Sequence, residues 1–221
     1  MKCDGAIIDM DGTLLDSMPF WLNLDRNILR SFGIDLEGEA YQKARMLSNA
    51  ERIRFYQTEY GVSPTDEEIS ERYESHLEAF YFHQAQIKPG VVDLLQRLKA
   101  AGVRMCVATA TPRHYAGGAL QRLGLLEYFQ FVISCVDVGR GKTDPKIYEE
   151  ALARLKTPRS ATLVIEDAVY AAATAKFSGF QVIGVYDDSF RDRQDELRRV
   201  ADIHVYSLTE MAAIPIERST P

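Results

Sequence analysis

Short apolar runs alternate with longer amphipathic segments along most of this chain. The runs that predict strands are residues 6–8, 103–108, 131–133, 161–165, 180–185 and 203–205. They show little alternation of polar and apolar positions, which is typical of strands buried in a parallel sheet. Helical spacing characterises the intervening residues 90–102, 113–123, 146–155, 168–178 and 192–200. This order predicts an α/β protein with a doubly wound parallel sheet and right-handed crossovers.

A different pattern fills residues 18–87, where no strand-like run occurs. Apolar residues recur at helical spacing from Phe20 to Phe32, and Gly33 favours the end of that helix. Further helices are predicted over residues 38–60 and 66–83, with Ser63 or Thr65 as the cap of the second. We therefore expect an all-helical domain of residues 18–87, inserted into a core domain of residues 1–17 and 88–221.

The first predicted strand ends in an acidic stretch, Asp9-Met10-Asp11-Gly12-Thr13. Residues just beyond the carboxyl ends of parallel strands lie where α/β proteins bind ligands. Asp9 and Asp11 would point the same way in an extended strand. Two carboxylates aimed at one point repel each other unless a cation or a proton lies between them. The stretch therefore predicts a metal site or an acid/base pair, with a solvated turn as the simplest alternative.

Hydroxyl groups follow the second predicted strand. Thr109 comes directly after the apolar run, and Ala110 and Thr111 are the next residues. A hydroxyl at this place, together with nearby backbone N–H groups, can hydrogen-bond a phosphate oxygen. A threonine at a strand end is also common for structural reasons. We favour Thr109 over Thr111 because it adjoins the strand.

A basic stretch precedes the helix predicted at residues 146–155. Lys142 lies in Gly141-Lys142-Thr143, and Lys146 opens the helix. The tripeptide Gly141-Lys142-Thr143 resembles the end of a nucleotide-binding P-loop. That motif would need a glycine at position 136, where Val136 stands, so the P-loop is excluded. Either lysine can contact an anion, and sequence spacing alone leaves the choice open.

The strand predicted at residues 161–165 runs into a second acidic stretch, Glu166-Asp167. Asp167 alone could be a helix N-cap. Together with Asp9 and Asp11, these residues place four carboxylates at the ends of predicted strands. An oxygen-rich set of this kind suits Mg²⁺, which keeps several waters and also accepts phosphate oxygens.

These stretches resemble the sequence motifs of the haloacid dehalogenase superfamily. The first resembles D-x-D-G-T-L-x-D-S, and the last resembles the E-D pair that follows an apolar strand in that family. Residues 141–148 resemble G-K-P-x-P-D-x-[FY], although Thr143 and Lys146 stand where proline and aspartate are usual. The Gly-Lys pair and Pro145 fix the register, and this register favours Lys142 over Lys146 as the phosphate-binding lysine.

The resemblance implies a Rossmann-like core, a helical cap at residues 18–87 and a magnesium-dependent phosphatase of small phosphorylated metabolites. It makes Asp9 the nucleophile that forms an aspartyl-phosphate, and Asp11 the general acid and base. Lys142 and Thr109, with the backbone at Ala110, would bind the phosphoryl group. The implied Mg²⁺ ligands are Asp9, Asp11, Glu166 and Asp167.

Other activities occur on the same kind of fold. A sugar phosphomutase similar to β-phosphoglucomutase would carry a histidine where this chain has Trp21. A phosphonatase would need a cap lysine, and residues 18–87 contain only Lys43. The intact set of motif residues disfavours a catalytically silent binding protein. Three cap arginines are candidates for contact with a second anionic group of the substrate: Arg45, Arg52 and Arg54.

Composition adds limits on partners and location. A net charge of −6 and a pI of about 5.3 disfavour nucleic-acid binding. No apolar run approaches about 18 residues, and no signal peptide precedes the first strand, so we expect a cytoplasmic protein that does not engage membranes. Its three cysteines lack C-x-x-C spacing and are expected to be reduced thiols. We expect a monomer or a weak homodimer.

Overall fold

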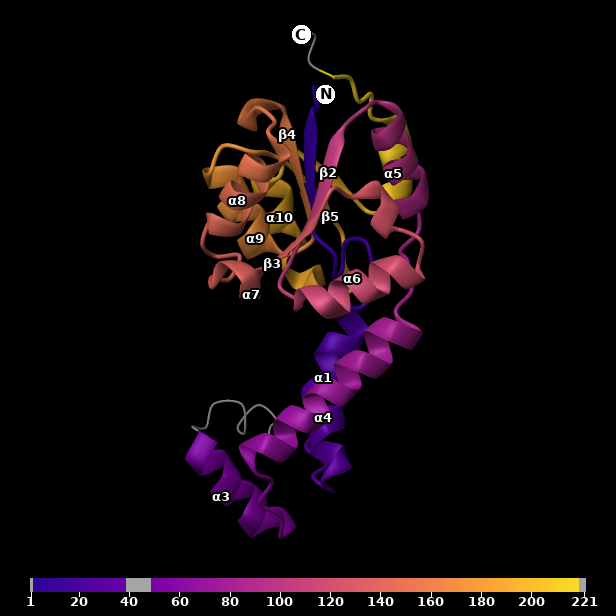
Figure 1. The fold of residues 1–221 in the computed structure, drawn as a ribbon. Helices are drawn as coiled ribbons and strands as arrows, with labels where there is room; N and C mark the ends of the chain where they lie inside the picture. The colour runs from indigo at the N-terminus through magenta and orange to yellow at the C-terminus, as the bar shows by residue number, and fades with distance from the viewer. Residues whose placement is uncertain (1, 39–48, 219–221) are drawn as a thin grey trace. The chain divides into compact units, whose positions relative to one another are not determined.

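The computed structural model describes residues 2–38 and 49–218 (Figure 1). The chain folds as two compact units, one of Met1–Met18 and Tyr81–Pro221 and the other of Pro19–Phe80. The first unit contains a parallel sheet with helices on both faces, and the second is built from helices. No helix among the described residues is both long enough and apolar enough to cross a membrane.

The sheet has six strands, and every neighbouring pair is parallel. The strands are β1 (Gly5–Ile8), β2 (Arg104–Thr109), β3 (Val132–Ser134), β4 (Thr162–Glu166), β5 (Gln181–Val185) and β6 (Ile203–Val205). Their order is β3-β2-β1-β4-β5-β6, which confirms the predicted doubly wound sheet. The direction of winding reverses between β1 and β4. Ligands of such folds bind beyond the carboxyl ends of the strands at this switch point.

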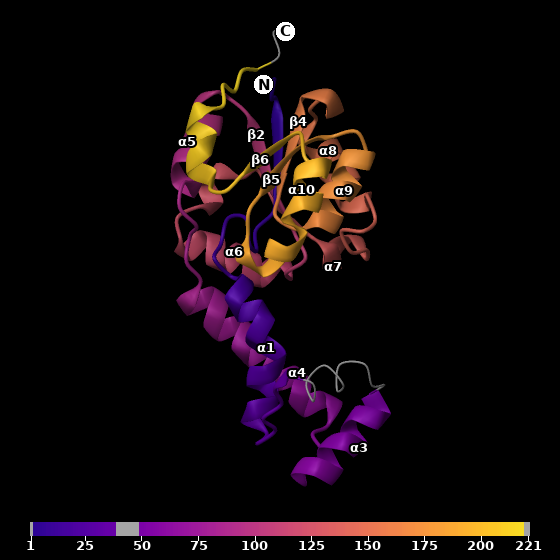
Figure 2. The same ribbon diagram turned by 180° about the vertical axis from the view of Figure 1, so that it is seen from behind.

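Helices cover both faces of the sheet (Figures 1 and 2). One face carries α5 (Val91–Ala100) and α6 (Arg113–Arg122), and the other carries α8 (Lys146–Leu155), α9 (Val169–Phe177) and α10 (Gln194–Val200). Shorter helical segments complete the unit: η2 (Leu126–Tyr128), α7 (Cys135–Val138), η3 (Arg159–Ala161), η4 (Asp188–Arg193) and η5 (Leu208–Ala213). The five main helices match the segments expected from the apolar spacing to within about two residues at each end, an ordinary uncertainty in helix ends.

The apolar core beneath the switch point fixes the ends of β1 and β4. Ile7 and Val164 are almost completely buried there, among residues of α8 and α9 such as Ala151 and Ala172. Alanines let these helices approach the sheet closely. Burial of each large aliphatic side chain contributes roughly 1.5–3 kcal/mol, so the strand ends are held on a well-packed base.

The helical unit contains α3 (Asn49–Tyr60), α4 (Asp66–Ala79) and most of α1 (Met18–Ser31). Thr65 caps α4, because its side chain accepts from the backbone of Glu68 while the Glu68 side chain accepts from the backbone of Thr65. A short π-helical turn, η1 (Phe80–Gln84), follows α4 at the position where the sequence pattern predicts continued α-helix. Part of the helix predicted at residues 38–60 lies outside the described residues.

The two segments that connect the units pair with each other. Leu15 forms an antiparallel bridge with Ile87. The backbone N–H of Asp16 donates to Gln86 O at 2.9 Å, and that of Lys88 donates to Leu14 O at 2.9 Å. The chain therefore leaves the sheet unit and returns to it through one hydrogen-bonded ribbon.

Candidate active site

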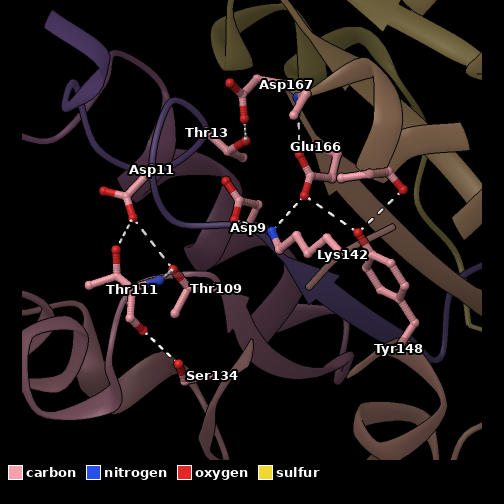
Figure 3. Close-up of polar contacts among 12 residues, drawn as sticks. Asp9, Asp11, Thr13, Thr109, Thr111, Ser134, Lys142, Tyr148, Glu166 and Asp167 are labelled. Carbon is pink, nitrogen blue, oxygen red and sulfur yellow. Dashed lines mark hydrogen bonds and ion pairs between the residues drawn. The ribbon is translucent and has the colours of Figure 1, made fainter. Parts of the chain in front are cut away.

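Lys142 lies at the centre of the polar groups beyond β1 and β4 (Figure 3). Its ammonium group forms ion pairs with Asp9, which follows β1, and with Glu166 Oε1 at 2.5 Å, at the end of β4. All three residues are at most 6% exposed. Because an unpaired charge is costly at such a depth, each of these ions depends on the others.

Asp167 extends this group to three carboxylates. Asp9, Glu166 and Asp167 each offer one oxygen, and these oxygens lie within 4.8 Å of one another. Thr13 Oγ1 donates to Asp167 Oδ1 at 3.1 Å. The other oxygen, Asp167 Oδ2, is buried and has no hydrogen-bond partner among the described residues. When all three carboxylates are ionised, Lys142 leaves the cluster with two uncompensated negative charges, which fits one divalent cation.

The turn after β1 packs closely against the unpaired oxygen of Asp167. Gly12 has a φ of +84°, a conformation that side chains disfavour, and a Cβ at this position would lie 2.3 Å from Asp167 Oδ2. Lys88 holds the turn in place, since its ammonium donates to Gly12 O at 2.6 Å and to Asp187 Oδ2 at 2.8 Å. Only a residue without a side chain therefore fits beside this buried oxygen.

The charges in the cluster shift its proton equilibria. Burial raises the pKa of Asp9 despite the opposing charge of Lys142, and burial together with the charge of Glu166 raises the pKa of Asp167. Burial alone would lower the pKa of Lys142, but Asp9 and Glu166 hold it well above its usual range. A bound cation would favour the ionised forms of Asp9 and Asp167, because its charge opposes both the burial and the repulsion that raise their pKa values.

Asp11 belongs to a separate hydrogen-bond network. Its Oδ1 accepts from Ser17 Oγ and from the hydroxyl of Tyr81, each at 2.7 Å, and its Oδ2 accepts from Thr111 Oγ1 at 2.7 Å. β1 ends at Ile8, so the expectation that Asp9 and Asp11 share one strand face does not apply beyond it. The place of Asp11 among metal ligands stays a prediction.

The end of β2 supplies the hydroxyl and backbone groups expected there. Thr109 is fully buried, and its Oγ1 accepts from the backbone N–H of Thr111 at 3.0 Å. Thr109 Oγ1 also lies 3.4 Å from Asp11 Oδ2 (Figure 3). Ser134 Oγ donates to Thr111 O at 2.9 Å, so this turn is tied to β3. Ala110, between Thr109 and Thr111, is exposed.

The loop before α8 separates the two candidate lysines. Lys142 reaches the carboxylates, whereas the ammonium of Lys146 donates to Val138 O at 2.9 Å and closes the loop on α7. Tyr148, on α8, is buried with its hydroxyl 3.5 Å from Glu166 Oε1. The sequence assigned no role to Tyr148 beyond its match to an aromatic motif position.

The candidate specificity residues are in the helical unit. Arg54 is exposed on α3. Lys43, Arg45 and the side chain of Arg52 lie outside the described residues. Trp21 is on α1, where its ring contacts Phe20 at a centroid distance of 5.7 Å.

Known proteins resemble this chain over nearly its whole length. A phosphoglycolate phosphatase of Rhodobacter capsulatus is 30% identical over 210 residues, which cover 91% of this chain and 92% of that protein. Hexitol phosphatase B of Escherichia coli K12 is 25% identical over 211 residues and 94% of each chain. The fold matches the crystal structure of CbbY from Rhodobacter sphaeroides in complex with phosphate, with a TM-score of 0.73 over 95% of this chain and 96% of that chain, at 22% identity.

The family comparison agrees with the motifs and with the doubly wound sheet. The model of the haloacid dehalogenase-like hydrolases matches residues 3–179, which include every residue of the carboxylate cluster. The chain belongs to the haloacid dehalogenase-like hydrolase family.

Proposed function

We propose that this protein is a magnesium-dependent phosphatase that hydrolyses a small phosphomonoester through an aspartyl-phosphate on Asp9. The observation that carries the proposal is the buried group of Asp9, Lys142, Glu166 and Asp167, with the unpaired Oδ2 of Asp167. Relatives named as phosphatases of phosphoglycolate and of hexitol phosphates support the substrate class.

In the first step, a carboxylate oxygen of Asp9 attacks phosphorus in line with the bond to the leaving oxygen. The new O–P bond forms as the old one breaks, and Asp11 gives its proton to the departing alkoxide. Lys142, Thr109 and the backbone N–H groups near Ala110 hold the phosphoryl oxygens as their charge redistributes. Mg²⁺, held by Asp9, Glu166 and Asp167, would offset the repulsion between the anionic nucleophile and the phosphate.

In the second step, water attacks the phosphorus of the aspartyl-phosphate. Asp11, now ionised, accepts a proton from this water. The bond between phosphorus and Asp9 breaks, inorganic phosphate leaves, and both carboxyl groups return to their starting states. This cycle needs no reactant besides the ester and water.

We propose that the helical unit, Pro19–Phe80, serves as a cap that selects the substrate. It is a separate compact unit, connected to the sheet unit by two chain segments only. Segments of this kind act as hinges in enzymes that exclude bulk water during phosphoryl transfer. We expect the protein to act in the cytoplasm, as a monomer or weak homodimer.

The function is tested by measuring inorganic phosphate released from 2-phosphoglycolate, sorbitol 6-phosphate, glucose 1-phosphate and p-nitrophenyl phosphate in the presence of Mg²⁺. We expect phosphate from at least one ester at the rate at which that ester is consumed.

A run with glucose 1-phosphate and a trace of glucose 1,6-bisphosphate tests the phosphomutase alternative. Trp21 in place of the mutase histidine leads us to expect little glucose 6-phosphate. Isomerisation without phosphate release would establish a mutase, and inertness toward all four esters would contradict the proposal.

Lys142 and Lys146 form a matched pair for testing the phosphate-binding lysine. Lys142→Gln is expected to lower kcat/KM by about 10²–10³-fold, the usual effect of losing one preorganised donor in an active site. Lys146→Gln is expected to change kcat/KM by less than about threefold, since this ammonium contacts only Val138 O among the described residues. Circular dichroism would verify that both variants fold. The opposite ranking would contradict the role given to Lys142.

A further inference from the structure

Four hydroxyl groups of the described residues surround the carboxylate of Asp11, one of which is Thr109 Oγ1 at 3.4 Å from Oδ2. Ser17 and Tyr81 contact Oδ1, and Thr111 contacts Oδ2, all at 2.7 Å. Tyr81 is fully buried, and its hydroxyl oxygen also lies 3.0 Å from Thr111 Oγ1. The carboxylate is therefore fixed from two sides by groups that lie outside the acidic cluster.

The backbone and ring of Tyr81 are themselves held in place. Tyr81 is in the π-helical turn η1, a conformation that is often found at functional sites. Its ring stacks against Tyr115 at a centroid distance of 6.1 Å. The guanidinium of Arg122 donates to Ala85 O at 2.5 Å and to Tyr81 O at 3.4 Å. These contacts let the hydroxyl act as a fixed donor.

We infer that Tyr81 is a positioning residue for Asp11, one that sets the orientation in which this carboxyl group gives its proton to the leaving oxygen. The inference rests on the proposed phosphatase function. Proton transfer requires donor and acceptor to be aligned within hydrogen-bond reach, so the free rotation of a carboxyl group lowers the fraction of productive encounters. Tyr81 restricts that rotation through its hydrogen bond to Asp11 Oδ1 and acts on the substrate only through Asp11.

Tyr81→Phe removes the hydroxyl and keeps the ring. The test compares kcat/KM for sorbitol 6-phosphate, whose alkoxide leaves poorly, with kcat/KM for p-nitrophenyl phosphate, whose phenolate leaves without a proton. We expect a loss of about 10–100-fold for the alkyl ester and less than about threefold for the aryl ester. Asp11→Asn should show the same asymmetry with a larger loss. Tyr81→Phe added to Asp11→Asn should cause little further loss, because coupled residues are not additive.

Tyr115→Phe is the matched control, since it removes a neighbouring hydroxyl and is expected to leave the ratio of the two kcat/KM values unchanged. Equal losses of kcat/KM on both esters in Tyr81→Phe would mean a packing role, and wild-type values on both would mean no role; either overturns the inference. A crystal structure of Tyr81→Phe gives a readout independent of turnover. There the Asp11 carboxylate is expected to adopt more than one orientation, and a carboxylate left in place would overturn the inference even if the proposed function failed.

Discussion

Asp9→Asn is expected to reduce turnover by about 10⁴-fold or more, because a neutral amide oxygen cannot serve as the nucleophile for phosphoryl transfer. Asparagine keeps the shape of the side chain. Lys142 keeps its ion pair with Glu166, so we expect the variant to fold. The loss should appear in kcat with every ester that the wild type accepts, since all of them share the covalent step.

Steady-state phosphate release measures this loss, and circular dichroism verifies the fold. Asp188→Asn is the matched control, because Asp188 is exposed and contacts only the Tyr186 hydroxyl among the described residues; it should retain wild-type kcat. A crystal structure with beryllium fluoride should place the phosphoryl analogue on Asp9 of the wild type. An analogue bound to another side chain, or substantial turnover by Asp9→Asn, would contradict the assignment.

Removal of divalent cations is expected to lower kcat/KM by about 10³-fold, with recovery when Mg²⁺ is added. The carboxylate cluster keeps two uncompensated negative charges beside Lys142 when it is fully ionised. A phosphate ester adds further negative charge at the same place, and a cation typically supplies several kcal/mol of stabilisation there. The activity should therefore follow the occupancy of the metal site.

Two measurements check this expectation. Phosphate release is followed after dialysis against a chelator and after titration with Mg²⁺. Thermal unfolding is followed in parallel, because a ligand that binds only the folded state raises its stability by about 2.7 kcal/mol at 100 times Kd. Asp167→Asn should weaken both responses, since it changes the unpaired oxygen into part of a neutral amide. Unchanged activity after exhaustive chelation would exclude a required metal.

Much of the fold follows from local sequence, because apolar runs and helical spacing mark elements that are buried in the core. The expected helix at residues 146–155 and the strand at residues 203–205 coincide with α8 and β6. The short helix α7 was not expected, since the apolar residues after Ser134 resemble a continued strand. Its sequence signal is the capping box that Ser134 forms with Asp137.

The site is less predictable because it depends on contacts between distant parts of the chain. Motif spacing pointed to Lys142 and to the acidic residues, but it assigned no role to Tyr81, which lies 70 residues from Asp11 in sequence. Nor could the spacing show that β1 ends at Ile8 or that Gly12 has a positive φ, because both are features of the folded backbone. Such contacts have no fixed sequence interval, so periodicity cannot reveal them.

The hydrogen-bonded ribbon of Leu14–Asp16 and Gln86–Lys88 has a consequence for how such enzymes diversify. Because these backbone bonds hold the two ends of the insertion side by side, an inserted unit can change in length or sequence without altering the register of the sheet. The entropy of closing a loop grows only slowly with its length, so longer insertions carry a small thermodynamic cost. The ribbon therefore makes residues 19–80 a replaceable module, open to exchange by recombination or by protein engineers, while the carboxylate cluster stays where it is.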